Sequence, residues 1–288
     1  ETLMLNAESA LRQAQASGDL MAFYEPRMNA RAVESLRFEY KLRCALDNGE
    51  FVLHYQPKVD FGGGAIYQVE ALMRWNDPET GLVPAARFIP ALEEMGLIER
   101  AGAWAFKQAV ADVGRWRAMG RAPPRVAVNV SAIQLRSGKF LSDIEDALTG
   151  FSDGPPMLDL EVTESMLMAD IAQAAAILKR VRGMHINIAV DDFGTGYSSL
   201  AYLAELPINA LKIDRSFVVA MDDAGPGKAI VAAIISLAHA LDMQVIAEGV
   251  ETRAQADQLE RLGCDLMQGY LISRPIPFDE LGDLLPLA

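Results

Sequence analysis

The chain has 288 residues, of which 51% are hydrophobic and 23% are charged, and its formal net charge is −13 at pH 7. This composition excludes global disorder, because it supplies enough apolar side chains for a large core, and the length suits one large α/β domain with an appendage. A surface this acidic repels the backbones of DNA and RNA, so a nucleic-acid polymer is excluded as the expected partner. A small anionic substrate remains compatible with the charge if bound cations reverse its sign locally.

The apolar runs and the cysteines indicate a compartment. No secretory signal is recognisable, and the longest apolar run, Ala229 to Leu241, is too short to span a bilayer and contains His239. Cys44 and Cys264 lie far apart and form no metal or redox motif, which predicts two buried thiols in a reducing compartment. We therefore expect a cytoplasmic location, with no membrane contact by this part of the chain. Because the sequence opens at Glu1 within a helical pattern, we expect it to belong to a longer protein that a membrane anchor could tether.

The N-terminal part is predicted to be helical. A helical pattern covers residues 1–18, a short irregular stretch follows at 23–31, and a second helix runs from about Ala32 to Leu46. The second helix is expected to end near Asn48-Gly49, where glycine favours a helix end. We expect residues 1–29 to be an appendage and residues 30–288 to be the main domain.

From Phe51 onward, short apolar runs alternate with longer helical segments. The strand candidates are 51–59, 66–75, 125–131, 158–164, 186–193, 210–217, 244–250 and 264–272, and the helical candidates include 99–119, 171–184, 227–241, 253–262 and 279–285. Strands that alternate with helices imply parallel βαβ units. Eight strands in this order favour a closed TIM-type (β/α)8 barrel.

The first two strands are predicted to depart from that barrel. Only the short link DFGGGA, residues 60–65, joins them, whereas a parallel crossover needs about a dozen residues or more. We therefore expect an antiparallel hairpin with Gly62 to Gly64 at its tip, and an α/β fold that is a modified TIM barrel with an antiparallel first strand. The reversal still leaves Gln56 at about the level of Glu70.

Polar side chains occupy the carboxyl ends of the predicted strands, where β/α barrels carry their active sites. Seven of the eight strands contribute to this set, which comprises Glu70, Asn129, Glu161, Asp191, Asp192, Lys212, Glu248 and Gln268. A single carboxylate at a strand end is usually a helix cap or a solvated loop residue. Several acids that converge on one barrel mouth would repel one another unless cations lay between them. The set therefore predicts a metal centre.

The ligand types predict a hard metal. Carboxylate and amide oxygens suit Mg²⁺ or Mn²⁺. His54, His185 and His239 are scattered away from the strand ends, which disfavours zinc and predicts structural roles for these histidines. The adjacent acids Asp191 and Asp192 could each hold an ion, or one of them could bridge two ions, as in sites that activate water for phosphoryl transfer.

Two of these features also admit other interpretations. The segment DDFGTGYSSL, residues 191–200, is either a helix entry with capping serines or a loop that positions Asp192. Lys212 could be a buried lysine paired with Asp214. It could also form a Schiff base in an aldolase, and a metal lyase is a further alternative for such a barrel.

The motifs of the chain resemble those of the EAL domain family, the cyclic di-GMP phosphodiesterases. VEALMRW at residues 69–75 resembles the family signature, and the resemblance extends from about Leu36 to Leu285. The supporting motifs are QPK (56–58), FIP (88–90), NVS (129–131), EVTE (161–164), DDFGTGYSSL (191–200), LKID (211–214), AEGVE (247–251) and QGYLISRP (268–275). Ala91 and Ile272 are small departures at apolar positions. The stretch at residues 6–26 resembles the tail of a GGDEF domain.

The resemblance implies metal-dependent hydrolysis of cyclic di-GMP to linear pGpG, with two ions of Mg²⁺ or Mn²⁺, and a homodimer. The implied metal ligands are Glu70, Asn129, Glu161 and Asp191, completed by Asp192 and Glu248. The implied catalytic residues are Lys212, which would orient or help deprotonate the attacking water, Gln268, which would fix that water or a phosphate oxygen, Glu248 and Glu70. The implied substrate contacts are Gln56, Arg74, Asp214, Glu251 and Gln268, and Glu164 would brace the 191–200 loop. A protein that senses the nucleotide without cleaving it would be expected to lack some of these residues, and this chain has them all.

Overall fold

The computed structural model describes residues 2–17, 19–62, 64–149, 157–194, 202–221 and 226–288. The contacts divide the chain into two compact units, one formed by Glu1–Phe51 with Trp75–Leu97 and the other by Val52–Arg74 with Ile98–Ala288. The expected boundary between an appendage and the main domain, at residues 29 and 30, stays a prediction.

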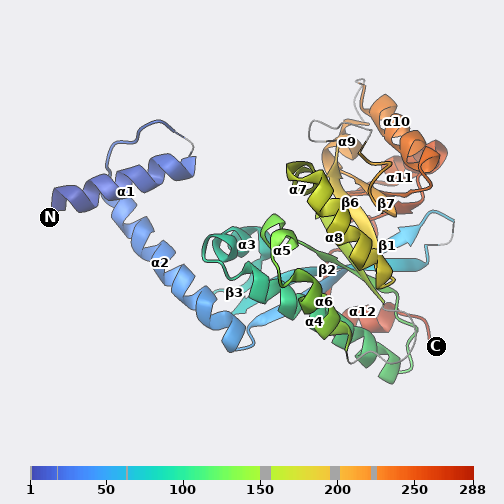
Figure 1. The fold of residues 1–288 in the computed structure, drawn as a ribbon, viewed down its shortest axis with the longest axis horizontal. Coiled ribbons are helices and arrows are strands. Elements are labelled where there is room, and N and C mark those ends of the chain that lie inside the picture. The colour runs from blue at the N-terminus through green and yellow to red at the C-terminus, as the bar shows by residue number, and fades with distance from the viewer. Residues whose placement is uncertain (1, 18, 63, 150–156, 195–201, 222–225) are drawn as a thin grey trace. The chain divides into compact units, whose positions relative to one another are not determined.

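The larger unit is a closed eight-stranded barrel with helices around it (Figure 1). Its strands are β1 (Phe51–Asp60), β2 (Ile66–Asp77), β4 (Arg125–Asn129), β5 (Leu158–Thr163), β6 (Asn187–Phe193), β7 (Ala210–Ile213), β8 (Gln244–Ala247) and β9 (Leu266–Met267). They follow one another in the order β1-β9-β8-β7-β6-β5-β4-β2, and the pairing of β1 with β2 closes the ring. The short strand β10 (Ile276–Pro277) pairs with β1, and the short strand β3 (Gly81–Pro84) belongs to the smaller unit. The prediction of an eight-stranded barrel is confirmed.

Strand β1 runs antiparallel to its neighbours, as the short link predicts. It pairs in this sense with β9, with Val59 opposite Met267, and with β10, with Tyr55 opposite Ile276. The other pairs around the ring, from β2 and β4 to β8 and β9, are parallel. Gly64 has a φ of +66° in the hairpin turn, a conformation that glycine adopts without steric cost. Gly63, also expected at the tip, lies outside the described residues.

All five predicted helices of the barrel are present. They are α4 (Ile98–Ala118), α8 (Ile171–Gly183), α10 (Gly227–Ala240), α11 (Arg253–Leu262) and α12 (Phe278–Leu284), each within one residue of its predicted bounds. The structure adds helices that the sequence pattern did not predict, α5 (Ala132–Arg136), α6 (Phe140–Leu148), α7 (Glu164–Ala169) and α9 (Arg215–Ala220). Three of them, α5, α7 and α9, have only five or six residues, too few for a helical period to show.

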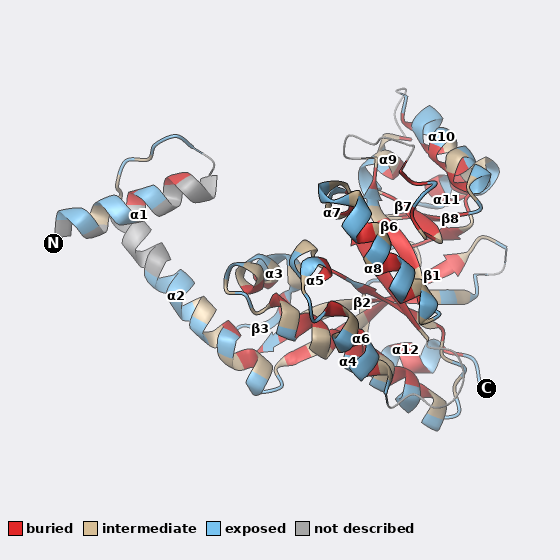
Figure 2. Cartoon of the chain, in the orientation of Figure 1, coloured by how far each residue is buried: buried red, intermediate tan, exposed pale blue. Residues whose placement is uncertain are grey.

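The barrel strands carry apolar side chains on both faces, one face toward the helices and the other toward the barrel axis. Buried residues concentrate in the strands and on the inner sides of the helices (Figure 2). Side chains such as Leu160 and Leu211 belong to the large core between strands and helices. The alternate positions point into the barrel, where Ala189, Ala210, Ile246 and Leu266 form a separate small cluster. This period of two directs one set of residues to the helices and the other to the barrel axis.

Polar side chains lie inside the barrel at one end of its axis, where the parallel strands have their amino ends. Asp159, which is 3% exposed, accepts hydrogen bonds from Arg125 Nε at 2.9 Å, from Gln68 Nε2 at 2.6 Å and from the backbone N–H of Asn187 at 3.0 Å. Each partner lies near the start of its own strand. We call these four residues the floor network, because they lie at the end of the barrel opposite the carboxyl ends of the parallel strands.

The smaller unit contains α1 (Thr2–Ser17), α2 (Pro26–Asp47), β3 and α3 (Ala85–Glu94). Both predicted N-terminal helices are present, but α2 begins at Pro26 and not at Ala32. Proline favours the first turn of a helix, where its missing N–H has no helical acceptor and its φ is already helical. The stretch that was expected to be irregular up to residue 31 is therefore helical from Pro26 onward.

A buried carboxylate ties α2 to the end of β2 within the smaller unit. Asp77 is 4% exposed and accepts hydrogen bonds from Lys41 Nζ at 2.8 Å, from Thr80 Oγ1 at 2.6 Å and from the backbone N–H of Glu79 at 3.1 Å. Burial opposes the charge of Asp77, but these hydrogen bonds outweigh it and lower the pKa of Asp77 to about 2. Asp77 therefore stabilises the folded state as a carboxylate.

Replacing Asp77 by Ala is expected to lower the free energy of unfolding by about 2 kcal/mol at pH 7, because several donors lose a buried, charged acceptor. The folded pKa of about 2 lies below the value of about 3.9 for an unfolded aspartate, so this contribution is present above about pH 4 and is lost as the pH falls toward 2. Urea unfolding at pH 7 and at pH 2.5 measures both effects. Glu79→Ala, at a side chain that is 55% exposed, is the control and should change stability little. Equal losses in the two variants would contradict the role of Asp77.

Candidate active site

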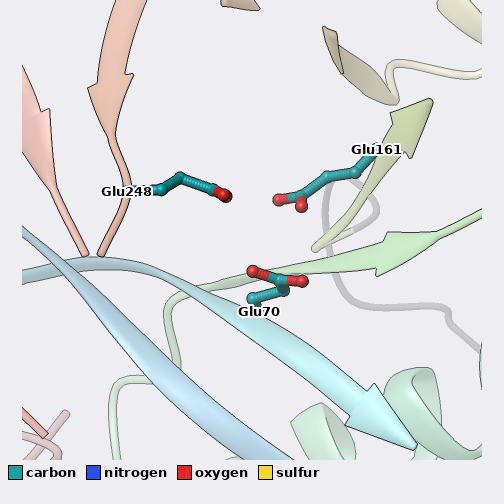
Figure 3. Close-up of side chains that lie close together, drawn as sticks. All are labelled: Glu70, Glu161 and Glu248. Carbon is teal, nitrogen blue, oxygen red and sulfur yellow. The ribbon is translucent and has the colours of Figure 1, made fainter. Parts of the chain in front are cut away.

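The predicted strand-end residues meet at one end of the barrel, which we call the mouth. Glu70, Asn129, Glu161, Asp191 and Lys212 lie in β2, β4, β5, β6 and β7, and Glu248 and Gln268 directly follow β8 and β9. Figure 3 shows the carboxylates of Glu70, Glu161 and Glu248 pointing toward one another from three strands. One oxygen of each lies within 4.8 Å of the others. The structure therefore brings the predicted set together.

Lys212 lies at the centre of these acids. Its Nζ is 3.0 Å from Asp191 Oδ2 and 3.5 Å from Glu70 Oε2, and it forms further ion pairs with Glu161 and Glu248. Burial opposes its charge, but the four carboxylates outweigh burial and raise the pKa of Lys212 well above its usual value. Lys212 is therefore an ammonium that several acids share, and the alternative pairing with Asp214 is not its arrangement.

Glu70 is held as a carboxylate. Burial opposes its charge, but Lys212 and Lys58 nearby, together with hydrogen bonds from Gln268 at 2.7 Å and Asn129 at 2.6 Å, outweigh burial and lower the pKa of Glu70 to about 2. Both amides donate to Glu70 through their nitrogen atoms, so their oxygen atoms remain for other partners.

Glu248 shows the opposite tendency. Burial, which outweighs the attraction of Lys212, acts together with repulsion from Asp191 and Glu70 to raise the pKa of Glu248 to about 8. Burial and the nearby Glu70 also raise the pKa of Glu161. The acids at the mouth thus exceed what the lysines neutralise, and added positive charge would be bound favourably there.

An irregularity in β6 brings two successive acids to the mouth. The register between β6 and β7 shifts between Val190 and Phe193, and Asp192 has a φ of +53°, which is uncommon for a residue with a side chain. In a regular strand Asp191 and Asp192 would point to opposite faces. Here one oxygen from each of Asp191, Asp192 and Glu248 lies within 4.8 Å of the others. Burial and the adjacent Asp191 raise the pKa of Asp192.

Gln268 connects the antiparallel strand to the ring of acids. Its Nε2 donates to Gln56 Oε1 at 2.9 Å and to Glu70 Oε2 at 2.7 Å, which confirms that Gln56 reaches the level of Glu70. Gln268 is 4% exposed, and its Oε1 has no hydrogen-bond partner among the described residues. A buried acceptor of this kind costs free energy unless a donor satisfies it. The amide oxygen is therefore suited to bind a water or a ligand group at the mouth.

The donor set fits hard divalent cations. Two groups of three carboxylates within the described residues could hold a metal, one formed by Glu70, Glu161 and Glu248 and the other by Asp191, Asp192 and Glu248. The shared Glu248 places the two groups side by side. Mg²⁺ and Mn²⁺ favour oxygen ligands, whereas zinc favours nitrogen and sulfur, which neither group contains. The ammonium of Lys212, amid the same oxygens, shows that this place stabilises positive charge.

A cavity of about 210 Å³ opens at the mouth. It is lined by Gln56, Glu70, Leu72, Asp191, Lys212, Arg215, Glu248, Gly249, Glu251, Gln268, Gly269 and Tyr270. Two predicted substrate contacts, Arg74 and Asp214, are not among these lining residues. Arg74 donates to the backbone oxygen of Met73 at 2.9 Å, and Asp214 accepts from the backbone N–H of Ser216 at 3.0 Å as the N-cap of α9.

The cavity wall includes residues that the sequence analysis did not identify. Arg215 forms an ion pair with Glu251 at 2.8 Å. A Cβ on Gly249, whose φ is +66°, would lie 2.3 Å from Cγ of Arg215, so only glycine leaves room for that arginine. The guanidinium of Arg274 lies 4.2 Å over the ring of Tyr270. Two of these residues could have been identified from their place in the sequence, because Arg215 follows Asp214 directly and Tyr270 is two residues beyond Gln268.

Glu164 contacts one residue within the loop that it was expected to brace and one residue just after that loop. Its Oε2 accepts from the backbone N–H of Gly194 at 3.1 Å, and its Oε1 accepts from the hydroxyl of Tyr202 at 3.1 Å. Residues 195–200 of the expected loop lie outside the described residues. The bracing role of Glu164 stays a prediction that these two contacts support.

The histidines and cysteines lie apart from the mouth groups. Nδ1 of His54 is 3.4 Å from the backbone oxygen of Pro275, and His239 pairs with Asp265 at 2.9 Å. Both cysteines are free thiols, and burial raises the pKa of Cys264 to about 12. The expectation of two buried thiols is wrong for Cys44, which is only half-buried, because it lies at the edge of α2's buried face. Among the described residues, no helix has the length and apolar character needed to cross a membrane.

Comparison with known proteins identifies a family and relatives that resemble this chain. The sequence matches the EAL domain family over residues 39–275. MucR of Pseudomonas aeruginosa, named a bifunctional diguanylate cyclase/cyclic di-GMP phosphodiesterase, is 42% identical over 280 residues, which cover 97% of this chain and 41% of MucR. NbdA of the same species, named a cyclic di-GMP phosphodiesterase, is 40% identical over 286 residues, which cover 99% of this chain and 36% of NbdA. The chain thus spans roughly two fifths of the length of these relatives.

A solved structure supports the same relationship. The c-di-GMP complex of the PaMucR phosphodiesterase superposes with a TM-score of 0.80 at 43% sequence identity. The superposition covers 84% of this chain and 98% of that one. The likeness therefore extends to nearly the whole of that phosphodiesterase domain.

Replacing Lys212 by Met is expected to destabilise the metal-free protein by about 3–5 kcal/mol, because several buried carboxylates lose their shared counter-ion. Mg²⁺ should then raise the Tm of the variant by more than it raises the wild-type Tm, since the cation supplies the missing positive charge. Thermal unfolding in EDTA and in Mg²⁺ measures both effects. Lys179→Met, at an exposed position of α8, is the control and should leave both values unchanged. An equal response to Mg²⁺ in wild type and Lys212→Met would contradict the expectation.

Proposed function

Because the chain belongs to the EAL domain family, we propose that it is a phosphodiesterase that hydrolyses cyclic di-GMP to linear pGpG. The observation that carries the proposal is the ring of strand-end carboxylates around Lys212, at the end of the barrel where β/α enzymes bind substrate. The names of MucR and NbdA and the bound c-di-GMP of the PaMucR structure support the choice of substrate. An acidic mouth repels an anionic nucleotide, so binding of the substrate depends on cations.

The residues that would hold Mg²⁺ or Mn²⁺ are those of the two carboxylate groups with the amide of Asn129. They are Glu70, Asn129, Glu161, Asp191, Asp192 and Glu248. Two ions fit this set, with Glu248 common to both groups. When bound, the cations lower the pKa of water and neutralise charge on the phosphate. Burial and the neighbouring acids raise the pKa of Glu248, and added positive charge would favour its carboxylate form.

Lys212 and Gln268 act on the water and the phosphate in this proposal. The water oxygen forms a bond to phosphorus while the bond from phosphorus to a ribose oxygen breaks in line, and the proton that the water loses is balanced by the proton that the departing ribose oxygen takes up. The raised pKa of Lys212 makes it a hydrogen-bond donor that orients the water, which the sequence alone left open against deprotonation. The unpartnered Oε1 of Gln268 accepts a hydrogen bond from that water. Glu70 and Glu248 complete the catalytic set.

The remaining side chains hold the substrate. Gln56 and Glu251 line the cavity and stay proposed contacts. Arg74 carries a guanidinium suited to a phosphate, and its side chain would have to turn from the backbone oxygen of Met73 to reach one. Asp214 would likewise have to release its capping hydrogen bond to Ser216. The structure therefore supports the first pair of contacts more directly than the second.

The Schiff-base alternative is disfavoured by the surroundings of Lys212. A lysine attacks a carbonyl as the neutral amine, and enzymes favour that form by removing the lysine from negative charge. Lys212 instead lies against four carboxylates that stabilise its ammonium. The same carboxylates suit the metal-dependent reaction.

The assembly and the compartment are proposals that rest on the family resemblance and on the composition. We propose a homodimer, which sedimentation of the purified chain would test, and a cytoplasmic location. The relatives are more than twice as long as this chain, so any regulatory input from other domains of a longer protein is a separate question.

Wild-type protein with Mg²⁺ or Mn²⁺ is expected to convert cyclic di-GMP into linear pGpG, and EDTA should abolish the conversion. Glu70→Ala and Asp191→Ala should each lower turnover by roughly three orders of magnitude, because the loss of a metal ligand removes several kcal/mol of transition-state stabilisation. Chromatographic separation of the two nucleotides measures the rate. Asp283→Ala, at an acid that is 83% exposed, is the matched control.

Two outcomes of this assay would contradict the proposal. Nucleotide that stays bound but intact with Mn²⁺ would indicate a sensor of cyclic di-GMP. Wild-type-like turnover by Glu70→Ala or Asp191→Ala at saturating Mg²⁺ would refute their assignment as ligands.

A further inference from the structure

A second buried lysine lies on the barrel axis, and the proposed mechanism does not use it. Lys58 is fully buried, with 0% of its surface exposed. Its Nζ donates to Glu161 Oε1 and, at 2.9 Å, to Gln68 Oε1. Burial of an ammonium costs free energy unless the ammonium is paired. The contacts of Lys58 must therefore stabilise its charge at this place.

The position of Lys58 follows from the reversed direction of β1. Side chains two residues apart on a strand share a face, so Gln56 and Lys58 both point into the barrel. Because β1 runs antiparallel to β9, the chain descends from the mouth toward the floor between these two residues. Gln56 is at the mouth, where it meets Gln268, and Lys58 is one layer below. A parallel strand would have placed the second residue above the mouth.

The two oxygens of Glu161 are divided between two lysines. Oε1 meets Lys58 and Oε2 meets Lys212. Lys212 is shared with Asp191, Glu248 and Glu70, the acids that would also surround a cation. Within the described residues Lys58 forms an ion pair with Glu161 alone, and Lys58 is not among the residues that line the cavity. A cation that enters the mouth therefore competes with Lys212 and leaves Lys58 in place.

Lys58 is itself anchored to the floor network. Gln68 accepts from Lys58 through Oε1 and donates through Nε2 to Asp159 at 2.6 Å. Asp159 in turn pairs with Arg125. The chain of contacts fixes the ammonium of Lys58 from below, and it joins the floor of the barrel to a proposed metal ligand at the mouth.

From this geometry we infer that Lys58 is a positioning residue for the cation site. It holds Oε1 of Glu161 so that Oε2 alone faces the mouth, and Glu161 then offers one oxygen to a cation. The inference rests on the metal dependence within the proposed function. Residues that hydrogen-bond a metal ligand from behind orient the ligand, and their loss typically weakens metal binding about 10–100-fold.

The direction in which cation affinity changes on removal of Lys58 distinguishes a positioning role from an effect of its charge alone. Lys58 is a cation close to a cation site, so its charge alone opposes binding of a divalent ion, and removal of the charge alone would tighten binding. If orientation of Glu161 dominates, removal of Lys58 weakens binding. The two accounts therefore predict opposite changes for one variant.

The test measures Mn²⁺ binding to the full chain by titration calorimetry without nucleotide. Lys58→Met keeps the length of the side chain and removes its charge, and it should weaken Mn²⁺ binding roughly 10–100-fold. Gln68→Leu keeps the charge of Lys58 and removes its anchor, and it should weaken binding in the same direction by roughly tenfold. Excess Mn²⁺ should restore the rate of pGpG formation in both variants. Lys179→Met should bind Mn²⁺ as wild type does.

Unchanged or tighter Mn²⁺ binding by folded Lys58→Met would overturn the inference. If thermal unfolding shows that Lys58→Met does not fold, Gln68→Leu decides alone, and wild-type Mn²⁺ binding by that variant overturns the inference as well. Hydrolysis by the wild-type protein is read separately. Wild-type protein that binds Mn²⁺ and leaves cyclic di-GMP intact refutes the proposed activity, while the weakened binding in the two variants would still support the role of Lys58.

Discussion

Repulsion among buried carboxylates is the interaction on which the mouth of this barrel depends. Two like charges 4 Å apart repel by about 4 kcal/mol at an effective dielectric constant of about 20. Four acids converge on one ammonium, and its single positive charge cannot balance them. They are Glu70, Glu161, Asp191 and Glu248. The fold moderates the repulsion through the shared Lys212, through the raised pKa of Glu248 and through space for cations. The affinity for metal is thus the counterpart of the instability of the metal-free site.

Much of this arrangement could be predicted from sequence because it follows from local rules. The alternation of strands and helices gave the barrel, and the six-residue link between the first two strands gave the antiparallel β1. The period of two along each strand, together with the rule that active sites lie at carboxyl ends, was enough to bring Glu70, Glu161 and Glu248 into one group. None of these steps requires knowledge of which side chains touch.

What could not be predicted depends on partners that are distant in sequence. The irregularity at Asp191 and Asp192 arises in the pairing of β6 with β7, which a single strand does not reveal. Lys212 could pair with Asp214 on sequence alone, but in the structure Lys212 meets four acids from other strands and Asp214 caps α9. The partner of Lys58 depends on which acid stands opposite β1 across the barrel. In each case the missing information is the geometry across the ring.

The direction of β1 has a consequence for how the barrel tolerates insertions and deletions. A one-residue deletion within β1 would reverse the alternation of faces on one side of the deletion, so that Gln56 or Lys58, or both, would turn toward the helices. The hairpin turn that follows β1 lies at the floor end, opposite the cavity. Extra residues there lengthen a surface loop without changing which side chains enter the barrel. The turn is therefore a natural place to insert a reporter peptide, whereas β1 itself is intolerant of any change in length.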